Sequence, residues 1–225
     1  MIGEFDGDLS HVAGKIRNCA VLERPFVHAI VDGVFPEELY RRMLDELPPV
    51  RQFQRAQFGR KRLSLPEHGN PYWRRLYAEL FASCVTREVV NRFRAHIRPG
   101  GDVTRLALRE CALVVDGLGY EIPPHSDSPH LKVLSVIFYL PRNDNRRDLG
   151  TCLLSPRREL PPPGKYRWQS WKDFEIVERI EFRPNRLLVF PVNDRSFHAV
   201  PRLWRFTRRE SLQAFIAEHQ GDRGA

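Results

Sequence analysis

The chain lacks the features of membrane-spanning, exported and zinc-knot proteins. No apolar run in its 225 residues reaches the length of about 18 that a membrane helix needs. The first ten residues contain three acidic side chains and no apolar stretch of the kind that signal peptides have. The four cysteines lie far apart and none belongs to a CxxC pair, which argues against a zinc knot. We therefore expect a cytoplasmic protein with reduced thiols and no membrane contact.

Positive charge is in excess, with a formal net charge of +8 and a pI of about 9.7. Such an excess admits an anionic partner, which could be nucleic acid, a phosphate or a carboxylate metabolite. Arginine supplies almost all of it, in short groups spread along the chain. A solvated surface explains this distribution better than a nucleic-acid footprint, so we expect a small-molecule partner and no nucleic acid.

The first 100 residues have mainly helical patterns. Pro36 opens a predicted helix at 37–47, with an apolar stripe of Leu39, Met43, Leu44 and Leu47. A longer helix is predicted at 72–97, and its buried side comprises Leu76, Leu80, Phe81, Val85, Val89 and Phe93. A short strand at 25–31 precedes both helices. The segment from Arg51 to His68 has weak periodicity and predicts a substrate-facing loop.

The second half changes to short strands separated by turn signals. Strands are predicted at 104–115, 132–140, 151–154, 174–182, 186–191 and 211–217. Helices followed by strands predict an α+β domain, mainly β, in which N-terminal helices buttress a jelly-roll core. We predict one domain over 1–225, with helical support and substrate-facing loops in 1–100 and the jelly roll in 101–218.

His125 and Asp127 stand two residues apart, and a second histidine follows at His198. Residues two apart on a strand point to the same face. Two imidazoles and one carboxylate form the facial triad of non-haem Fe(II) oxygenases, which leaves three positions open on the metal. Each residue alone has a simpler explanation, as a surface histidine, a turn former or a core histidine. Their order along the chain together with a downstream arginine favours a metal site.

That arginine is Arg209, which opens the apolar stretch 211–216. A guanidinium can hold a carboxylate with two parallel hydrogen bonds, and an arginine facing the inside of a barrel needs an anion. Arg208 is a rival for this role. We favour Arg209 because Arg209 and Ser211 share one face of a strand.

The segment 119–215 resembles the Fe(II)/2-oxoglutarate-dependent dioxygenase superfamily, in particular its prolyl-hydroxylase-like branch. The matching segments are GYEIPPHSD, LSVIFYLP, PNRLLVFP, SFHAV and RESLQAF. The resemblance implies a double-stranded β-helix, another name for the jelly roll, with the iron between its two sheets. It also implies that Fe(II) is bound by His125, Asp127 and His198, and that the distal carboxylate of 2-oxoglutarate is held by Arg209, Ser211 and Tyr139. Tyr120 would form a wall of the pocket.

The activity implied by this resemblance is hydroxylation of a C–H bond by O2, with release of succinate and CO2. The related halogenases have a small residue where this chain has Asp127, so the carboxylate argues for oxygen transfer, although desaturation or ring closure would use the same residues. The nucleic-acid demethylase branch carries a second arginine where this chain has Phe215, which argues against base repair. The run from Gly150 to Leu153 departs from the Gly-Gly-Glu-Leu pattern of the superfamily and leaves pocket details open.

Three functions remain open at this point. We expect a hydroxylase of a small, anionic or amino-acid-like substrate. An alternative keeps the site but makes the substrate a peptide or protein side chain, as in prolyl hydroxylases. The third is a catalytically silent jelly-roll binding protein, which is disfavoured because a binding module needs neither the triad nor the arginine.

Overall fold

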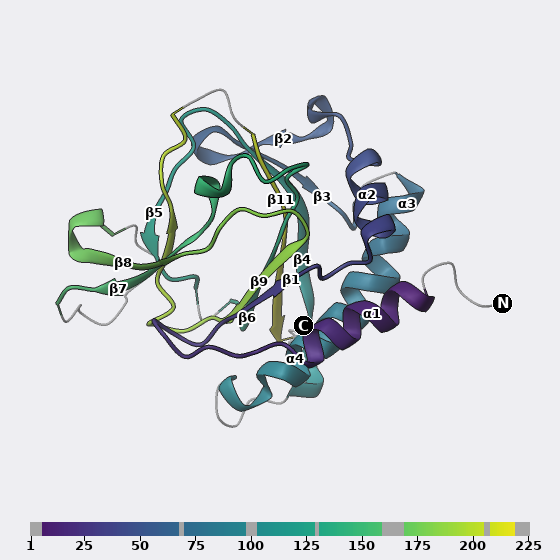
Figure 1. Ribbon diagram of the computed structural model, residues 1–225, viewed down its shortest axis with the longest axis horizontal. Helices are drawn as coiled ribbons and strands as arrows, with labels where there is room; N and C mark the ends of the chain where they lie inside the picture. Colours follow the sequence, from purple (N-terminus) through teal and green to yellow (C-terminus); the bar gives the residue numbers. More distant parts are fainter. Residues whose placement is uncertain are drawn as a thin grey trace, which may run out of the picture.

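The computed structural model describes residues 6–67, 70–97, 103–128, 131–158, 169–204 and 208–218. Helices cover one face of a large sheet, and a smaller sheet lies on its other side (Figure 1). The helices are α1 (Asp6–Arg17), α2 (Glu37–Asp45), α3 (Pro71–Arg75), the π-helix η3 (Leu76–Val85) and α4 (Thr86–Phe93). Short 3-10 turns are η1 (Val50–Gln52), η2 (Gln57–Gly59), η4 (Arg94–His96), η5 (Val103–Arg105), η6 (Arg147–Leu149) and η7 (Trp171–Asp173).

The large sheet has seven antiparallel strands in the order β1-β9-β6-β11-β4-β3-β2. Its strands are β1 (Ala29–Asp32), β2 (Gln54–Arg55), β3 (Arg60–Ser64), β4 (Leu106–Asp116), β6 (Leu134–Tyr139), β9 (Arg186–Pro191) and β11 (Arg209–Glu218). The small sheet has the order β5-β10-β7-β8, with β5 (Ile122–His125), β7 (Cys152–Pro156), β8 (Phe174–Arg179) and β10 (His198–Val200). The predicted α+β fold with a jelly-roll core behind N-terminal helices is confirmed.

Alternation along β11 divides its side chains between two surroundings. Leu212, Ala214 and Ile216 belong to the core that packs against the helices. Arg209 and Ser211 point the opposite way, toward the small sheet. Neighbouring β6 and β9 are apolar on both faces because helices cover one and the small sheet covers the other. Polar side chains of the large sheet, such as Arg209 and Ser211, therefore lie on its inner face.

The predicted helices occur where their apolar stripes indicated. The 72–97 prediction is one helical stretch made of α3, η3 and α4, with a short 3-10 turn after it, and all six residues predicted to face inward are buried. The α2 helix buries Leu39, Met43 and Leu44. Its C-terminal end is held by Trp73, whose indole Nε1 donates to the carbonyl of Glu46 at 2.7 Å. Among the described residues no helix is long and apolar enough to cross a membrane.

The segment from Arg51 to His68 is not the loop that its composition suggested. It forms the hairpin β2–β3, and β3 pairs with β4 in the large sheet. Alternation places Arg60 and Arg62 toward the inside and Leu63 toward the helices. The arginines concealed a strand, because an inward-facing charge breaks the apolar pattern. His68 lies outside the described residues, and α1 was not foreseen in the sequence.

Three strands of the large sheet come from the part predicted as helical support. These strands are β1, β2 and β3, all within the first 100 residues. The sheet therefore extends beyond 101–218. The sequence did not reveal this extension, because strand pairing depends on which sheet edge is free. A four-residue strand such as β1 also has too short an apolar pattern to show which strand it pairs with.

Gly150 precedes β7 at a point where another backbone passes within contact. A Cβ built on Gly150 would lie 1.4 Å from the carbonyl oxygen of Ile180. We expect Gly150→Ala to lower the free energy of unfolding by about 2–3 kcal/mol, because the backbone has to move. Urea denaturation measures this change. Gly14→Ala in α1 is the control: nothing lies within 4 Å of its Cβ position, so it should leave stability equal or higher. Equal losses in both variants would contradict the expectation.

Candidate active site

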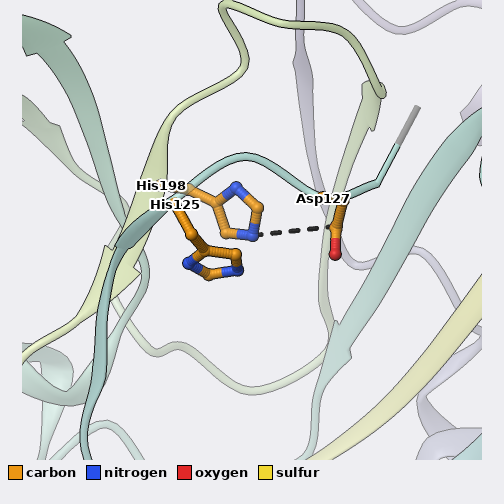
Figure 2. Close-up of side chains that lie close together, drawn as sticks. All are labelled: His125, Asp127 and His198. Carbon is orange, nitrogen blue, oxygen red and sulfur yellow. Dashed lines mark ion pairs between the residues drawn. The ribbon is translucent and has the colours of Figure 1, made fainter. Parts of the chain in front are cut away.

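The three predicted metal ligands come together between the two sheets. Their ligand atoms all lie within 4.8 Å of one another. His125 is the last residue of β5 and His198 the first of β10, and the two are paired across the small sheet. Asp127 lies just beyond the end of β5, so the argument from alternation along a strand does not hold for it. The carboxylate nevertheless faces the imidazoles (Figure 2), with its Oδ2 3.8 Å from Nε2 of His198.

Both imidazoles are fixed by the backbone in the same way. Nδ1 of His125 lies 2.9 Å from the carbonyl oxygen of Pro123, and Nδ1 of His198 lies 3.0 Å from that of Ser196. A carbonyl only accepts, so each Nδ1 carries the proton. Each Nε2 is then left with a lone pair, which is the atom a metal takes when the other ring nitrogen donates to a carbonyl.

Burial keeps the two imidazoles neutral. Desolvation lowers the pKa of His125 to about 3, and it also lowers the pKa of His198. For Asp127 burial acts to raise the pKa, but the electrostatic interactions with His198 and Lys132 and the hydrogen bond from Ser135 outweigh it and hold the pKa below its ordinary value. At neutral pH the site therefore contains two neutral imidazoles and one carboxylate. These are the protonation states that metal binding requires.

The carboxylate of Asp127 is held by two donors that the sequence did not assign to it. The hydroxyl of Ser135 donates to Oδ2 at 2.6 Å, and Nζ of Lys132 donates to Oδ1 at 3.0 Å. The Lys132 ammonium also lies 3.4 Å from the centre of the Phe215 ring. The donor set of two imidazole nitrogens and one carboxylate oxygen fits Fe(II).

Arg209 is buried on the inner face of β11, whereas Arg208 beside it is exposed. Its Nε donates to the carbonyl of Leu149 at 2.8 Å, Nη1 to Oδ2 of Asp116 at 2.9 Å and Nη2 to Oγ1 of Thr151 at 3.3 Å. A guanidinium has five N–H donors. Within the described part of the chain, two of the five are left for another acceptor.

The anion that balances Arg209 is Asp116, whose side chain is fully buried. Asp116 also takes two bonds from Arg60, at 2.7 Å from Nε to Oδ1 and at 3.1 Å from Nη2 to Oδ2. Asp116 directly follows the strand predicted at 104–115, and sequence analysis assigned it no role. A carboxylate directly at the end of the apolar run of β4 was the available signal, because such a group is rarely buried without a partner.

Tyr139 and Ser211 lie opposite each other on β6 and β11. The Tyr139 hydroxyl donates to Oγ1 of Thr151 at 2.8 Å and accepts from the Thr151 backbone N–H at 3.1 Å. Ser211 Oγ accepts from Nε2 of Gln213 at 3.3 Å. Thr151, in the run that departs from the superfamily pattern, thus connects Tyr139 to Arg209. Sequence reasoning missed Thr151 because a lone threonine carries no signal.

Tyr120, which was expected to form a wall of the pocket, is buried between the two sheets. Its side chain is 1% exposed and belongs to the cluster between the two sheets. Its hydroxyl accepts a hydrogen bond from Nη2 of Arg60, and the guanidinium carbon lies 4.7 Å from the centre of its ring. Tyr120 thereby fixes Arg60 beside Asp116.

No protein-family model and no curated protein sequence matches the chain. Solved structures do. A prolyl hydroxylase from Trichoplax adhaerens, in complex with a peptide of the hypoxia inducible factor, aligns with a TM-score of 0.57 at 16% identity over 93% of this chain and 89% of the other. A 2OG-Fe(II) oxygenase family protein from Burkholderia pseudomallei aligns with a TM-score of 0.54 at 15% identity, over 96% and 93%. HygX from Streptomyces hygroscopicus, with nickel and 2-oxoglutarate bound, gives 0.56 at 14%, over 86% and 83%. The chain therefore shares the jelly-roll fold of the 2-oxoglutarate oxygenases.

Proposed function

We propose that the protein is an Fe(II)- and 2-oxoglutarate-dependent dioxygenase that hydroxylates a C–H bond of a small molecule. One observation carries the proposal. Two imidazoles whose Nδ1 atoms donate to backbone carbonyls converge with an ionised carboxylate between the sheets, and a buried guanidinium lies on the large sheet, with two donors left over within the described part of the chain. A silent binding module would need neither arrangement. The fold shared with oxygenases agrees with the proposal.

His125, Asp127 and His198 would hold the iron. Backbone carbonyls fix both rings, and Ser135 with Lys132 fixes the carboxylate, so the ligands need little rearrangement to bind it. The Phe190 ring, 4.9 Å from that of His198, belongs to the apolar cluster between the sheets and helps to exclude water. Bound Fe(II) together with 2-oxoglutarate and O2 would supply the oxidising chemistry, with one oxygen atom passing to the substrate and succinate and CO2 released.

Arg209 would bind the distal carboxylate of 2-oxoglutarate through its two remaining donors. Ser211 lies two residues along the same inner face, and its hydroxyl hydrogen can donate to the same carboxylate. Tyr139 would act mainly through Thr151, because both its hydrogen and one lone pair are engaged there. The Thr151 hydroxyl accepts from Tyr139 and Arg209, which leaves its own hydrogen to donate.

The substrate we propose is small and anionic or amino-acid-like. The Lys132 ammonium supports this choice, since it is 21% exposed beside the ligand carboxylate and can meet an anionic group there. Among the structural neighbours, SnoN was solved with nogalamycin RO and HygX with hygromycin B, both small molecules. A peptide side chain is the second candidate, favoured by the neighbour solved with a peptide. Buried, free cysteines agree with the expected cytoplasmic location.

Loss of the ligand carboxylate tests the metal site. Asp127→Ala should abolish succinate formation and weaken Mn(II) binding at least about tenfold, because a carboxylate ligand and its charge are removed. Calorimetric titration with Mn(II) and succinate assays measure the two effects. Asp148→Ala is the matched control, since Asp148 is an exposed carboxylate paired with Arg146. Succinate formation that survives Asp127→Ala would refute the ligand assignment.

Arg209→Lys tests the co-substrate site while keeping the positive charge that Asp116 needs. A lysine cannot form the paired hydrogen bonds of a guanidinium, so 2-oxoglutarate should bind about 10- to 100-fold more weakly. The exposed neighbour provides the control: Arg208→Lys should bind 2-oxoglutarate as the wild type does. Equal losses in both variants, or none in Arg209→Lys, would remove Arg209 from the role.

The substrate class can be found from 2-oxoglutarate consumption. We expect amino acids or other small carboxylic acids to raise succinate formation above the rate without substrate, and nucleosides to leave it unchanged. A peptide that raises the rate more than any small molecule would favour the second candidate.

A further inference from the structure

Three charged residues lie side by side on the inner face of the large sheet. Asp116 on β4 is paired in register with Arg60 on β3 and with Arg209 on β11. Both guanidiniums bond the same carboxylate, Arg60 at 2.7 Å and 3.1 Å and Arg209 at 2.9 Å. Asp116 is fully buried, Arg209 is 1% exposed and the Arg60 side chain 18%.

We propose that Arg60 sets the affinity for 2-oxoglutarate by neutralising Asp116, so that Arg209 keeps a net positive charge for the co-substrate. This inference rests on the proposed function, in which Arg209 binds the distal carboxylate. Arg60 is then a positioning residue that acts through Asp116 and Arg209. It lies in the segment whose composition first suggested a loop over the substrate.

The charge count explains why a second arginine is needed. Asp116 and Arg209 alone would form a neutral pair, and a carboxylate approaching it would meet the charge of Asp116 as well as that of Arg209. With Arg60 the three groups carry a net charge of +1, which 2-oxoglutarate can neutralise. In a buried site such charges are weakly screened, so the difference in affinity should be about 10- to 100-fold.

Asp116 also helps to orient the guanidinium of Arg209. It takes Nη1 of Arg209 while Leu149 takes Nε and Thr151 takes Nη2, so the guanidinium plane is fixed from three sides. The carboxylate that orients Arg209 would also cancel the positive charge of Arg209. Arg60 prevents this because it neutralises Asp116. Gln213 and Tyr120 hold Arg60 in turn, with Nη1 of Arg60 3.3 Å from Oε1 of Gln213.

Arg60 also ties β3 to β4, so a merely structural role has to be separated from the electrostatic one. Arg62 is the matched control. It lies two residues along the same strand and on the same face, and it forms an ion pair with Glu110 at 2.9 Å in which both side chains are about 40% exposed or more. Within the described part of the chain Arg62 forms no hydrogen bond or ion pair with Asp116 or Arg209, so its loss should affect only the strand.

The experiment is calorimetric titration of the 225-residue chain, loaded with Mn(II), with 2-oxoglutarate and separately with pyruvate. Arg60→Gln should weaken 2-oxoglutarate binding about 10- to 100-fold, whereas Arg62→Gln should change it less than about threefold. Pyruvate has the 2-oxo acid group but no distal carboxylate, so its affinity should be the same in all three proteins. Parallel losses for both ligands in Arg60→Gln would overturn the proposal.

A double variant separates charge from structure. In Arg60→Gln combined with Asp116→Asn, Arg209 again carries a net charge of +1, so the affinity for 2-oxoglutarate should recover to within about tenfold of the wild type. A structural role predicts no recovery. Arg60→Lys keeps the charge, so its affinity for 2-oxoglutarate should lie within about fivefold of the wild type. This variant also tests the proposal if Arg60→Gln does not fold. If Arg60→Gln folds, equally weak binding of 2-oxoglutarate by Arg60→Lys overturns the proposal. If Arg60→Gln does not fold, loss of 2-oxoglutarate binding in Arg60→Lys overturns it.

The two levels of inference fail differently. If the wild-type protein with Mn(II) does not bind 2-oxoglutarate, the proposed function fails. If the wild type binds it and Arg60→Gln binds it equally well, only the role of Arg60 fails.

Discussion

The buried guanidinium of Arg209 is the group on which the inner face of the large sheet depends. A charge removed from water needs a partner and satisfied donors. Asp116 supplies the partner, and Leu149 with Thr151 accepts from the remaining sides. This one pair would cancel the charge of Arg209, and Arg60 brings a second cation to Asp116. The arrangement needs three neighbouring strands in register, so the β2–β3 hairpin belongs to the site as much as to the scaffold.

The layered architecture gives these polar groups their place. Helices η3 and α4 pack against β4 of the large sheet, and α1 packs against both of them. The helices lie on the outer face of this sheet (Figure 1), and the largest cluster of buried apolar side chains joins them to it. The inner face is therefore free to carry charged residues opposite the small sheet, which contributes His125 and His198. The same desolvation that makes Arg209 dependent on Asp116 keeps the imidazoles neutral. The two imidazoles and the buried guanidinium thus both lie between the two sheets.

Prediction succeeded where a residue type carries chemistry by itself. Two histidines and an aspartate in the order seen here are distinctive, and the structure brings all three together. Prediction failed where the role of a residue depends on its neighbours in the folded structure. Asp116 resembles a turn former, Thr151 an ordinary strand residue and Arg60 a solvated charge until β3, β4 and β11 are placed side by side. Asp127 was chosen correctly for an incomplete reason, since it lies beyond the end of β5.

The sequence by itself determined the fold class, the two main helical stretches and the identity of the three converging candidate ligands, because apolar periodicity and the chemistry of histidine and aspartate are local properties. Only the tertiary structure decided which arginine is buried, which carboxylate pairs with it and which hydroxyl groups join the pair. Those roles depend on strand register and on exclusion of water, and both arise from contacts between residues far apart in the chain, such as Arg60 and Asp116 or Asp116 and Arg209.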